Sequence, residues 1–190
     1  MRREEARERI LEATSELVRE RAFAELTVGE IMDRAGLERT VFYRHFENVS
    51  AVVLAAGRQA ITDMYEAQTA ISSSHESFDP DAIREALTLA AEVFHRHGPL
   101  LRGVFEAAAA NQLVTVGDDE IRSRFDGLVA AALRDLERRT GKRFADVEET
   151  ARALNRLNEN YLLDAFGHEP RVSVETAAET LSQIWIATTT

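Results

Sequence analysis

Cysteine is absent from the 190-residue sequence, and proline occurs only three times. The lack of cysteine excludes disulfide bonds and zinc sites built on thiolates. No apolar run reaches the roughly 18 residues that a membrane-spanning helix needs. The N-terminal stretch MRREEARERI also lacks the apolar core of a signal peptide. We therefore expect a cytoplasmic protein that makes no contact with a membrane.

Aromatic residues are also scarce, at 7%, although hydrophobic residues make up 45% of the chain. Alanine and leucine dominate and runs of β-branched residues are few, which favours helices over strands. The formal net charge is −10, so the body of the protein is poorly suited to nonspecific binding of nucleic acid. Residues 1–50 carry only −2 of this charge. Any basic surface must therefore be local, formed by arginines on one face.

Start and stop signals along the chain predict nine helices and no strand. The sequence TVGE at Thr27–Glu30 has the pattern of a capping box, in which the hydroxyl and the carboxylate each bind a free amide at a helix start. Gly36 is expected to end this short helix, and Gly98-Pro99 and Gly117 are expected to end helices further along. The predicted helices cover residues 3–22, 27–35, 38–45, 48–72, 80–97, 99–116, 118–140, 146–167 and 173–188.

The stretch AGLERTVFYRHF, residues 35–46, concentrates aromatic and basic side chains in one short segment. It follows a short helix and a glycine turn, which together give a helix-turn-helix arrangement. Phe42 and Phe46 lie four residues apart and share one helix face, so they should point into a core. Their expected partners in this core are Ile10, Leu26 and Ile31.

The opposite face of the same short helix would then be polar and exposed. In a helix-turn-helix the second short helix enters the major groove, where arginine suits guanine edges or phosphates and hydroxyl groups suit phosphate oxygens. The candidate DNA-contacting residues are Thr27, Arg39, Thr40, Tyr43, Arg44 and His45. The alternative is an ordinary helical hairpin whose arginines are solvated charges.

The order of these features resembles the TetR family of transcriptional regulators over residues 7–55. The resemblance rests on T-V-x-x-I, A-G-L, F-Y-R-H-F and the capped long helix that follows. It implies a dimer that binds a near-palindromic DNA operator. The sequence departs from the family pattern at Ala22, where glycine is usual, at Val41, where threonine is usual, and at Val49, where a phosphate-contacting lysine is usual. We expect Arg44 to supply a replacement phosphate contact.

A second resemblance covers residues 145–187. The segments ALNRLNENYLLDAFGHEP and LSQIW are similar to the subgroup of the ethionamide-resistance repressor. This resemblance implies that Asn155, Asn158 and Trp185 border a long hydrophobic tunnel, together with Glu159.

The residues themselves leave two interpretations of this region open. Asn155 and Asn158 lie on an apolar stripe, where an amide must find hydrogen-bond partners, so they fit either a ligand cavity or a satisfied position between helices. Phe94, Phe105 and Phe125 are candidates for an aromatic cavity lining, with ordinary core packing as the alternative. The predicted ligand is a small lipophilic effector.

The last two predicted helices carry apolar residues on more than one side. These are Leu154, Leu157, Tyr161 and Leu162 on the first helix and Ala177, Leu181, Ile184 and Trp185 on the second. Excess apolar surface indicates burial against a partner. Two such helices from each of two chains would form a four-helix interface with two-fold symmetry. We therefore expect a homodimer built on the last two helices.

No pattern in the sequence points to catalysis, a metal or a cofactor. His95 and His97 are two residues apart, so on a helix they point in nearly opposite directions and are expected to be cations at a helix end. There is no glycine-rich phosphate loop, no Ser/His/Asp order and no glutamate–histidine metal pattern. We expect that the protein is not an enzyme.

The sequence therefore predicts an all-α protein in two parts. Residues 1–47 would form a three-helix DNA-binding domain, and residues 48–190 a helical bundle for ligand binding and dimerisation. The expected function is that of a repressor that binds double-stranded operator DNA and is released by its effector. The alternatives are an activator of the same family and a dimeric small-molecule-binding protein without DNA binding.

Overall fold

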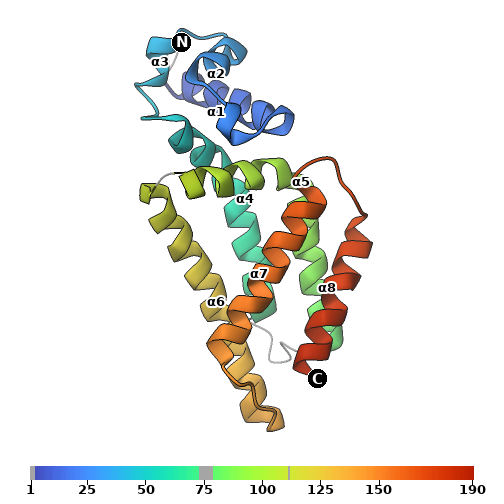
Figure 1. The fold of residues 1–190 in the computed structure, drawn as a ribbon. Coiled ribbons are helices and arrows are strands. Elements are labelled where there is room, and N and C mark those ends of the chain that lie inside the picture. The colour runs from blue at the N-terminus through green and yellow to red at the C-terminus, as the bar shows by residue number, and fades with distance from the viewer. Residues whose placement is uncertain (1–2, 73–78, 111) are drawn as a thin grey trace. The chain divides into compact units, whose positions relative to one another are not determined.

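The computed structural model describes residues 3–72, 79–110 and 112–190, and every regular element in these ranges is a helix (Figure 1). The elements are α1 (Arg3–Glu20), the 3₁₀ helix η1 (Phe23–Glu25), α2 (Val28–Ala35), α3 (Arg39–Phe42), α4 (Val49–Ser72), α5 (Pro80–Ala110), α6 (Gln112–Thr140), α7 (Val147–Phe166) and α8 (Val174–Thr189). The predicted all-helical fold is confirmed. The nine elements of the described ranges are nevertheless not the nine that the sequence predicts.

The chain divides into two compact units. Met1–Ile61 and Pro99–Asp118 form one, called here the N-terminal unit, and Thr62–Gly98 and Asp119–Thr190 form the other, called here the C-terminal unit. Helices α4, α5 and α6 each contribute residues to both units. No described helix combines sufficient length with sufficient apolar character to cross a bilayer.

Two predicted helix ends are wrong, because α5 continues through Gly98-Pro99 and α6 continues through Gly117. A Cβ atom at position 98 would lie 2.0 Å from the carbonyl oxygen of Phe166, so Gly98 serves close packing of α5 on α7 and not helix termination. Pro99 lacks one amide donor but leaves the rest of the helix intact. Glycine at position 117 costs about 1 kcal/mol in a helix interior without ending the helix.

The two histidines before Gly98 are consequently inside α5 and not at a helix end. His97 Nε2 lies 3.1 Å from Asp63 Oδ2 on α4. The ring of His95 meets that of Phe166 edge-on, at 5.4 Å between centroids. Both histidines therefore make contacts within the C-terminal unit.

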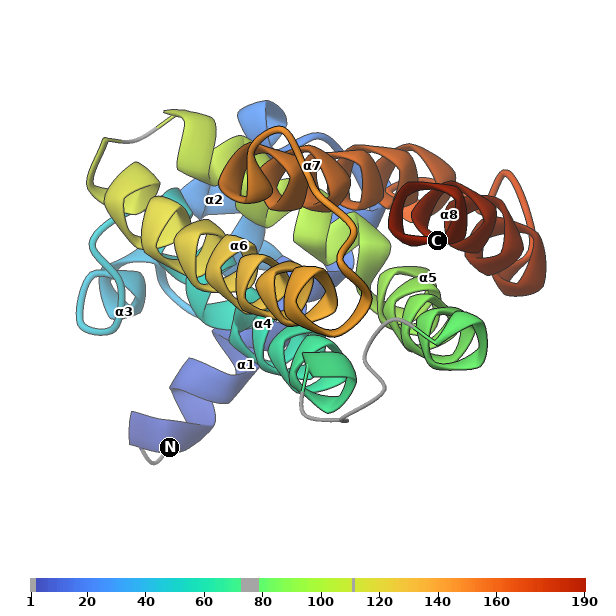
Figure 2. The same ribbon diagram turned by 90° about the horizontal axis from the view of Figure 1, so that it is seen from below.

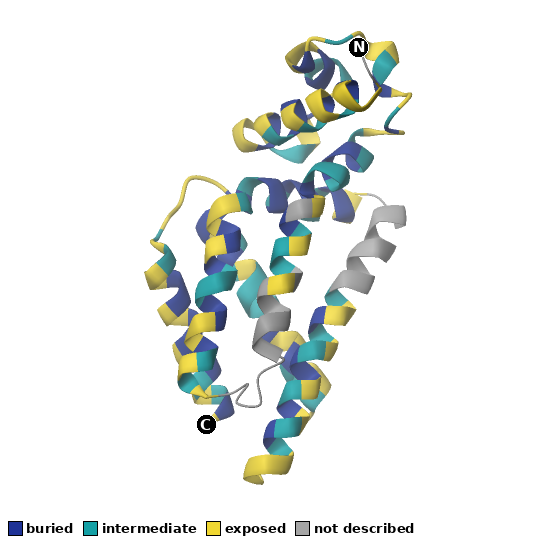
Figure 3. Ribbon diagram, turned by 180° about the vertical axis from the view of Figure 1, so that it is seen from behind, coloured by how far each residue is buried: buried dark blue, intermediate teal, exposed yellow. Residues whose placement is uncertain are grey.

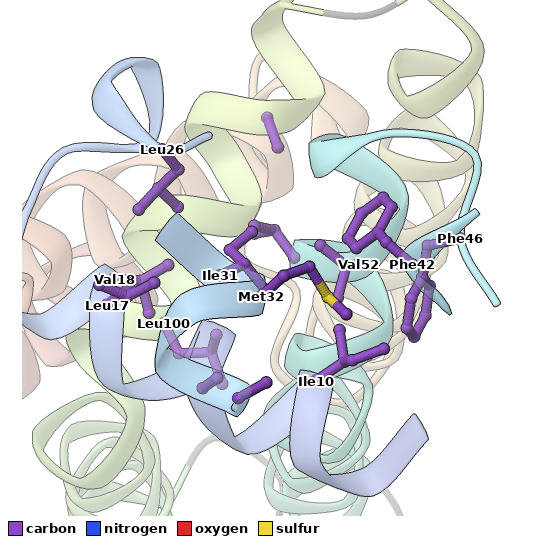
Figure 4. Close-up of a cluster of buried hydrophobic side chains, with 14 of the residues drawn as sticks. Ile10, Leu17, Val18, Leu26, Ile31, Met32, Phe42, Phe46, Val52 and Leu100 are labelled. Atoms are coloured by element: carbon purple, nitrogen blue, oxygen red, sulfur yellow. The ribbon is translucent and has the colours of Figure 1, made fainter. Parts of the chain in front are cut away.

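The core of the N-terminal unit contains the side chains that the sequence assigned to it. Ile10, Ile31 and Phe42 are fully buried, and Phe46 and Leu26 are each 7% exposed. Figure 4 shows these residues in one cluster with Val52 of α4 and Leu100 of α5. The predicted packing of the two phenylalanines is confirmed.

The short helix α2 begins and ends as its sequence predicts. Thr27 Oγ1 accepts a hydrogen bond from the amide of Glu30, and the Glu30 carboxylate accepts one from the amide of Thr27. Gly36 ends the helix in the left-handed conformation, with φ 63° and ψ 39°. This turn separates α2 from α3 by only a few residues.

Helix α3 is shorter than the predicted helix over residues 38–45. Its regular part ends at Phe42, and the amides of Arg44 and His45 bond three residues back, to the carbonyls of Val41 and Phe42. The chain thus tightens into turns after Phe42. The face that the predicted helix was expected to present is retained, because these turns still wind in the helical sense.

The C-terminal unit consists of the remaining helical segments. Asp146 and Ser173 cap α7 and α8, each accepting a hydrogen bond from an amide three residues on, as predicted. Helices α7 and α8 lie side by side in Figures 1 and 2. Figure 3 shows buried and exposed positions alternating along both helices, which is the pattern of helices packed on one face only.

Candidate functional site

The outer face of α3 and the turn after it carries the exposed polar residues that the sequence assigned to DNA contact. Arg39, Thr40, Tyr43 and Arg44 are all exposed, with Tyr43 at 57%. Phe42, between them in sequence, is fully buried. The polar side chains therefore project from a short segment whose opposite side is fixed in the core.

The turn that presents α3 is held by an arginine of α1. Arg9 Nη2 donates a hydrogen bond of 2.5 Å to the carbonyl oxygen of Ala35, next to Gly36. Glycine suits this turn because of its positive φ, and a Cβ atom at position 36 would lie 2.9 Å from the same nitrogen, so the end of the Arg9 side chain would have to shift. This role of Arg9 was not predicted from the sequence, because nothing in the spacing of α1 indicates which arginine reaches the turn.

Thr27 is exposed, but its hydroxyl is engaged within α2. Thr27 Oγ1 donates to Glu30 Oε2 at 2.8 Å and accepts from the Glu30 amide at 3.2 Å. Glu30 also forms an ion pair with Arg21. The one proton that the hydroxyl can donate is thus directed to a carboxylate, and a phosphate contact would have to displace it.

His45 is half-buried at the end of the α3 segment. Burial lowers the pKa of its imidazole below the usual range, and the nearby charges of Arg3 and Arg7 lower it further. The lowered pKa favours the neutral imidazole, which can still form a hydrogen bond with a phosphate.

Two further arginines, Arg3 and Arg7 on α1, belong to the same basic area. Their positive charges lower the pKa of His45, and the Arg7 guanidinium lies 5.7 Å from the centroid of the Phe46 ring. Within the described residues no ion pair joins either of them, or Arg39 or Arg44, to a carboxylate. The sequence signal for this pair was their four-residue spacing, which places both on one face of α1.

Two other arginines of the N-terminal unit are paired with carboxylates. Arg34 forms ion pairs with Glu16 and Glu20, which raises its pKa, and Arg21 pairs with Glu30. Arg3, Arg7, Arg39 and Arg44 therefore leave positive charge on α3 and at the start of α1 that no described ion pair neutralises, although the unit as a whole contains more acids than bases.

Val41 and Val49 replace two polar residues of the TetR pattern, and both have a packing role here. Each is partly buried and packs against the hydrophobic cluster of the N-terminal unit. The polar contacts that these positions would supply are therefore absent from this chain.

A cavity of about 90 Å³ lies within the C-terminal unit. One wall is an apolar stripe along α5 at helical spacing: Ile83, Ala86, Leu87, Ala90 and Phe94. Phe125, Val129 and Ala132 of α6, Leu162 of α7 and Met64 of α4 complete the apolar part. This composition is typical of a site for a largely apolar ligand.

The predicted polar lining residues are also at this cavity. Trp185 Nε1 donates a hydrogen bond of 3.0 Å to Asn158 Oδ1, and Asn155 Nδ2 donates one of 2.9 Å to Asp126 Oδ1. Asn155, Asn158 and Trp185 all line the cavity. The amides thus have partners within the protein and still contribute to the wall.

The phenylalanines expected beside them divide into two groups. Phe94 and Phe125 line the cavity. Phe105 does not belong to the lining, because it lies beyond Pro99 on the part of α5 that belongs to the N-terminal unit. Helical spacing alone gave no way to separate it from the other two.

Charged residues of α6 and α7 at the cavity wall were not part of the predicted site, except for Glu159. The Glu159 carboxylate accepts hydrogen bonds from Arg122 Nε and Nη2, at 3.2 and 2.6 Å, and from Arg156 Nη1 at 3.4 Å. All three side chains line the cavity. The apolar space therefore has a charged region made by two neighbouring helices.

Two protein-family models match this chain. The model for "Bacterial regulatory proteins, tetR family" matches residues 10–56, which include α2, α3 and most of α1. The model for "Transcriptional regulator EthR, C-terminal domain" matches residues 83–189, which include most of the cavity lining.

Individual relatives agree with these matches. The HTH-type transcriptional regulator EthR of Mycobacterium tuberculosis (strain ATCC 25618 / H37Rv) is 28% identical over 184 residues, covering 93% of this chain and 83% of that protein. EthR of Mycolicibacterium smegmatis (strain ATCC 700084 / mc(2)155) is 28% identical over 189 residues, covering 93% and 82%. Among solved structures, the TetR family regulator PfmR from Thermus thermophilus has a TM-score of 0.77 at 19% identity, covering 94% of this chain and 97% of that chain.

The fold and the two family matches define a helix-turn-helix transcription regulator with a helical C-terminal bundle, and not an enzyme. The chain belongs to the TetR family, and its C-terminal part is of the EthR type.

Proposed function

We propose that this regulator is a cytoplasmic homodimeric repressor that binds a near-palindromic operator and is released by a small lipophilic effector. DNA binding is assigned to residues 1–47, and effector binding and dimerisation to residues 48–190. The observation that carries the proposal is that one chain has both an exposed, arginine-bearing α3 and a mainly apolar cavity.

The DNA-binding part of the proposal rests on the charge and rigidity of the α3 segment. Arg39 and Arg44 are exposed, while Phe42 and Phe46 fix the same segment in the core. A rigid base with projecting guanidinium groups suits recognition in the major groove. Arg3 and Arg7 add positive charge that suits the flanking phosphates.

The effector response would depend on helices that belong to both compact units. Met64 of α4, Phe94 of α5 and Phe125 of α6 line the cavity, and each of these helices also contributes residues to the N-terminal unit. A ligand that fits the cavity in only one arrangement of these helices would shift the population toward that arrangement. Release from DNA requires such a difference in affinity, since a ligand that binds both arrangements equally changes nothing.

Dimerisation is proposed to use α7 and α8. Several apolar residues on these helices, including Leu162 and Leu181, are buried inside the chain itself. Leu157 and Tyr161 remain half-buried, and Ile184 is 40% exposed, so they are the residues left for a partner. Ile184→Glu should shift the protein from dimer to monomer in sedimentation velocity, and a dimer of unchanged stability would place the interface elsewhere.

The test of the function is fluorescence anisotropy with labelled DNA from the region flanking the protein's own gene, with scrambled DNA of the same length as the control. We expect sequence-dependent binding that weakens steeply with salt. Equal, weak binding to both DNAs would favour the alternative of a ligand-binding protein without DNA function. The packing roles of Val41 and Val49 would then account for the lost contacts.

A further inference from the structure

The cavity of the C-terminal unit is not uniformly lipophilic. Two arginines and one glutamate, Arg122, Arg156 and Glu159, stand among its mainly apolar lining. Charged side chains are costly to cover with apolar surface unless their hydrogen bonds are satisfied. A fully neutral, fully apolar effector would remove water from these groups and return no hydrogen bond.

The hydrogen bonds of this group are unevenly distributed. Glu159 accepts three, two of them from Arg122 in a bidentate arrangement. Arg156 makes one long bond to Glu159, at 3.4 Å, and its Nη2 lies 3.6 Å from Asp126 Oδ2, beyond hydrogen-bond distance. Among the described contacts, Arg156 is thus the charged lining residue whose donors are bound most weakly.

The nearby carboxylates do not leave a negative site. Glu159 is shared by two guanidinium groups, and Asp126 accepts a hydrogen bond from Asn155 and lies near Arg152 as well as Arg156. A cationic ligand would therefore find the acids already paired. An anionic ligand would supply hydrogen-bond oxygens to Arg156, whose ion pairs with Asp126 and Glu159 are at 3.6 and 3.4 Å.

We propose that the effector is an amphipathic organic acid, whose carboxylate or similar anionic group is bound by Arg156 next to Arg122 and whose apolar part lies against the α5 stripe. This rests on the proposed effector site and names the chemical class of its ligand. Arg156 is on α7 and Arg122 on α6, so an anion at this point contacts both helices.

The single tryptophan of the chain makes this proposal testable without DNA. Trp185 is the only tryptophan in the sequence, and it lines the cavity. Its fluorescence can be titrated on the full-length protein with decanoate and, as a neutral probe of the same chain length, methyl decanoate. Charge-assisted hydrogen bonds should make decanoate bind about tenfold more tightly or better.

Arg156→Gln should remove this preference for the acid by weakening the binding of decanoate, while methyl decanoate should bind at least as tightly as it does to the wild type. Arg152→Gln is the matched control, because Arg152 pairs with Asp126 and Glu149 but does not line the cavity. Arg156→Lys keeps the charge and should keep part of the preference. Thermal melting of each variant establishes that it is folded.

Three results would overturn the assignment: tighter binding of the ester, no change in Trp185 fluorescence with decanoate, or an unchanged preference in Arg156→Gln. The proposed repressor function fails separately, in the anisotropy assay with DNA. If the protein prefers the acid but does not bind the operator, the proposed ligand class is supported and the proposed repressor function is refuted.

Discussion

The clearest prediction for a single residue concerns Thr27, which has two possible roles in this protein. Its hydroxyl accepts the Glu30 amide bond of the α2 capping box and also donates a hydrogen bond to the Glu30 carboxylate. Thr27→Ala removes both bonds and leaves the first turn of α2 with an unsatisfied donor. Loss of an N-cap threonine costs about 1 kcal/mol, so the midpoint of urea unfolding should fall accordingly.

The pH dependence of this loss has a definite sign. The Thr27 hydroxyl is the largest cause that lowers the pKa of Glu30, and Arg21 lowers it further. A carboxylate with a lowered folded-state pKa stabilises the protein above its usual value of 4.5, and this contribution is lost as the pH falls through the lowered pKa. The difference between wild type and Thr27→Ala should therefore be larger at pH 7 than at pH 3.

Thr27→Ser is the control, because serine retains the hydroxyl and should restore most of the stability at pH 7. Unfolding in urea and operator binding should be measured on the same preparations. A Thr27→Ala variant with wild-type stability but weaker DNA binding would refute the capping interpretation. It would assign the hydroxyl to a phosphate contact.

Three further predictions concern packing and the cavity. Phe42→Ala should lower the free energy of unfolding by about 3–5 kcal/mol, because the ring is fully buried; a loss below about 1 kcal/mol in urea unfolding would contradict its anchoring role. Gly98→Ala should destabilise the protein by about 1–3 kcal/mol, because the new methyl group would clash with α7. Gly127→Ala is the control: a Cβ atom at position 127 would meet no atom within 4 Å, so this change should be neutral or slightly stabilising. Equal effects of the two variants in thermal melts would contradict this packing. Asn158→Leu removes the oxygen that accepts the hydrogen bond of the Trp185 indole. The variant should need a different effector concentration for release from DNA, while its operator affinity stays constant. A changed dimer dissociation constant instead would make the role of Asn158 structural.

Much of the N-terminal unit was predictable because its signals are local. The capping box, the left-handed Gly36 and the four-residue spacing of Phe42 and Phe46 each fix one step of the chain, and each is confirmed. The exposure of Arg39 follows from the same periodicity, since residues opposite the anchors must face outward. The link from Arg9 to the α2–α3 turn is a tertiary contact and has no such local signal.

The C-terminal unit was less predictable because its helices are long and their ends depend on tertiary packing. Gly98 has the local signal of a helix end, but the close approach of α7 is what requires glycine there. Phe94 and Phe105 have equivalent positions in an apolar pattern, and only the division of α5 between two units separates them. The contact between Arg122 and Glu159 joins residues 37 apart in sequence, which no spacing rule identifies.

The most direct test of the central claim, that α3 reads DNA, is operator binding by the Arg39→Ala/Arg44→Ala double variant at several salt concentrations. Its control is Arg138→Ala/Arg143→Ala, which removes the same charge from two exposed side chains of the C-terminal unit. We predict that the α3 variant loses sequence-specific binding and that its logarithmic salt slope falls in magnitude by about 0.9 for each phosphate contact removed. Unchanged affinity and salt slope in the α3 variant, with a folded protein, would contradict the account.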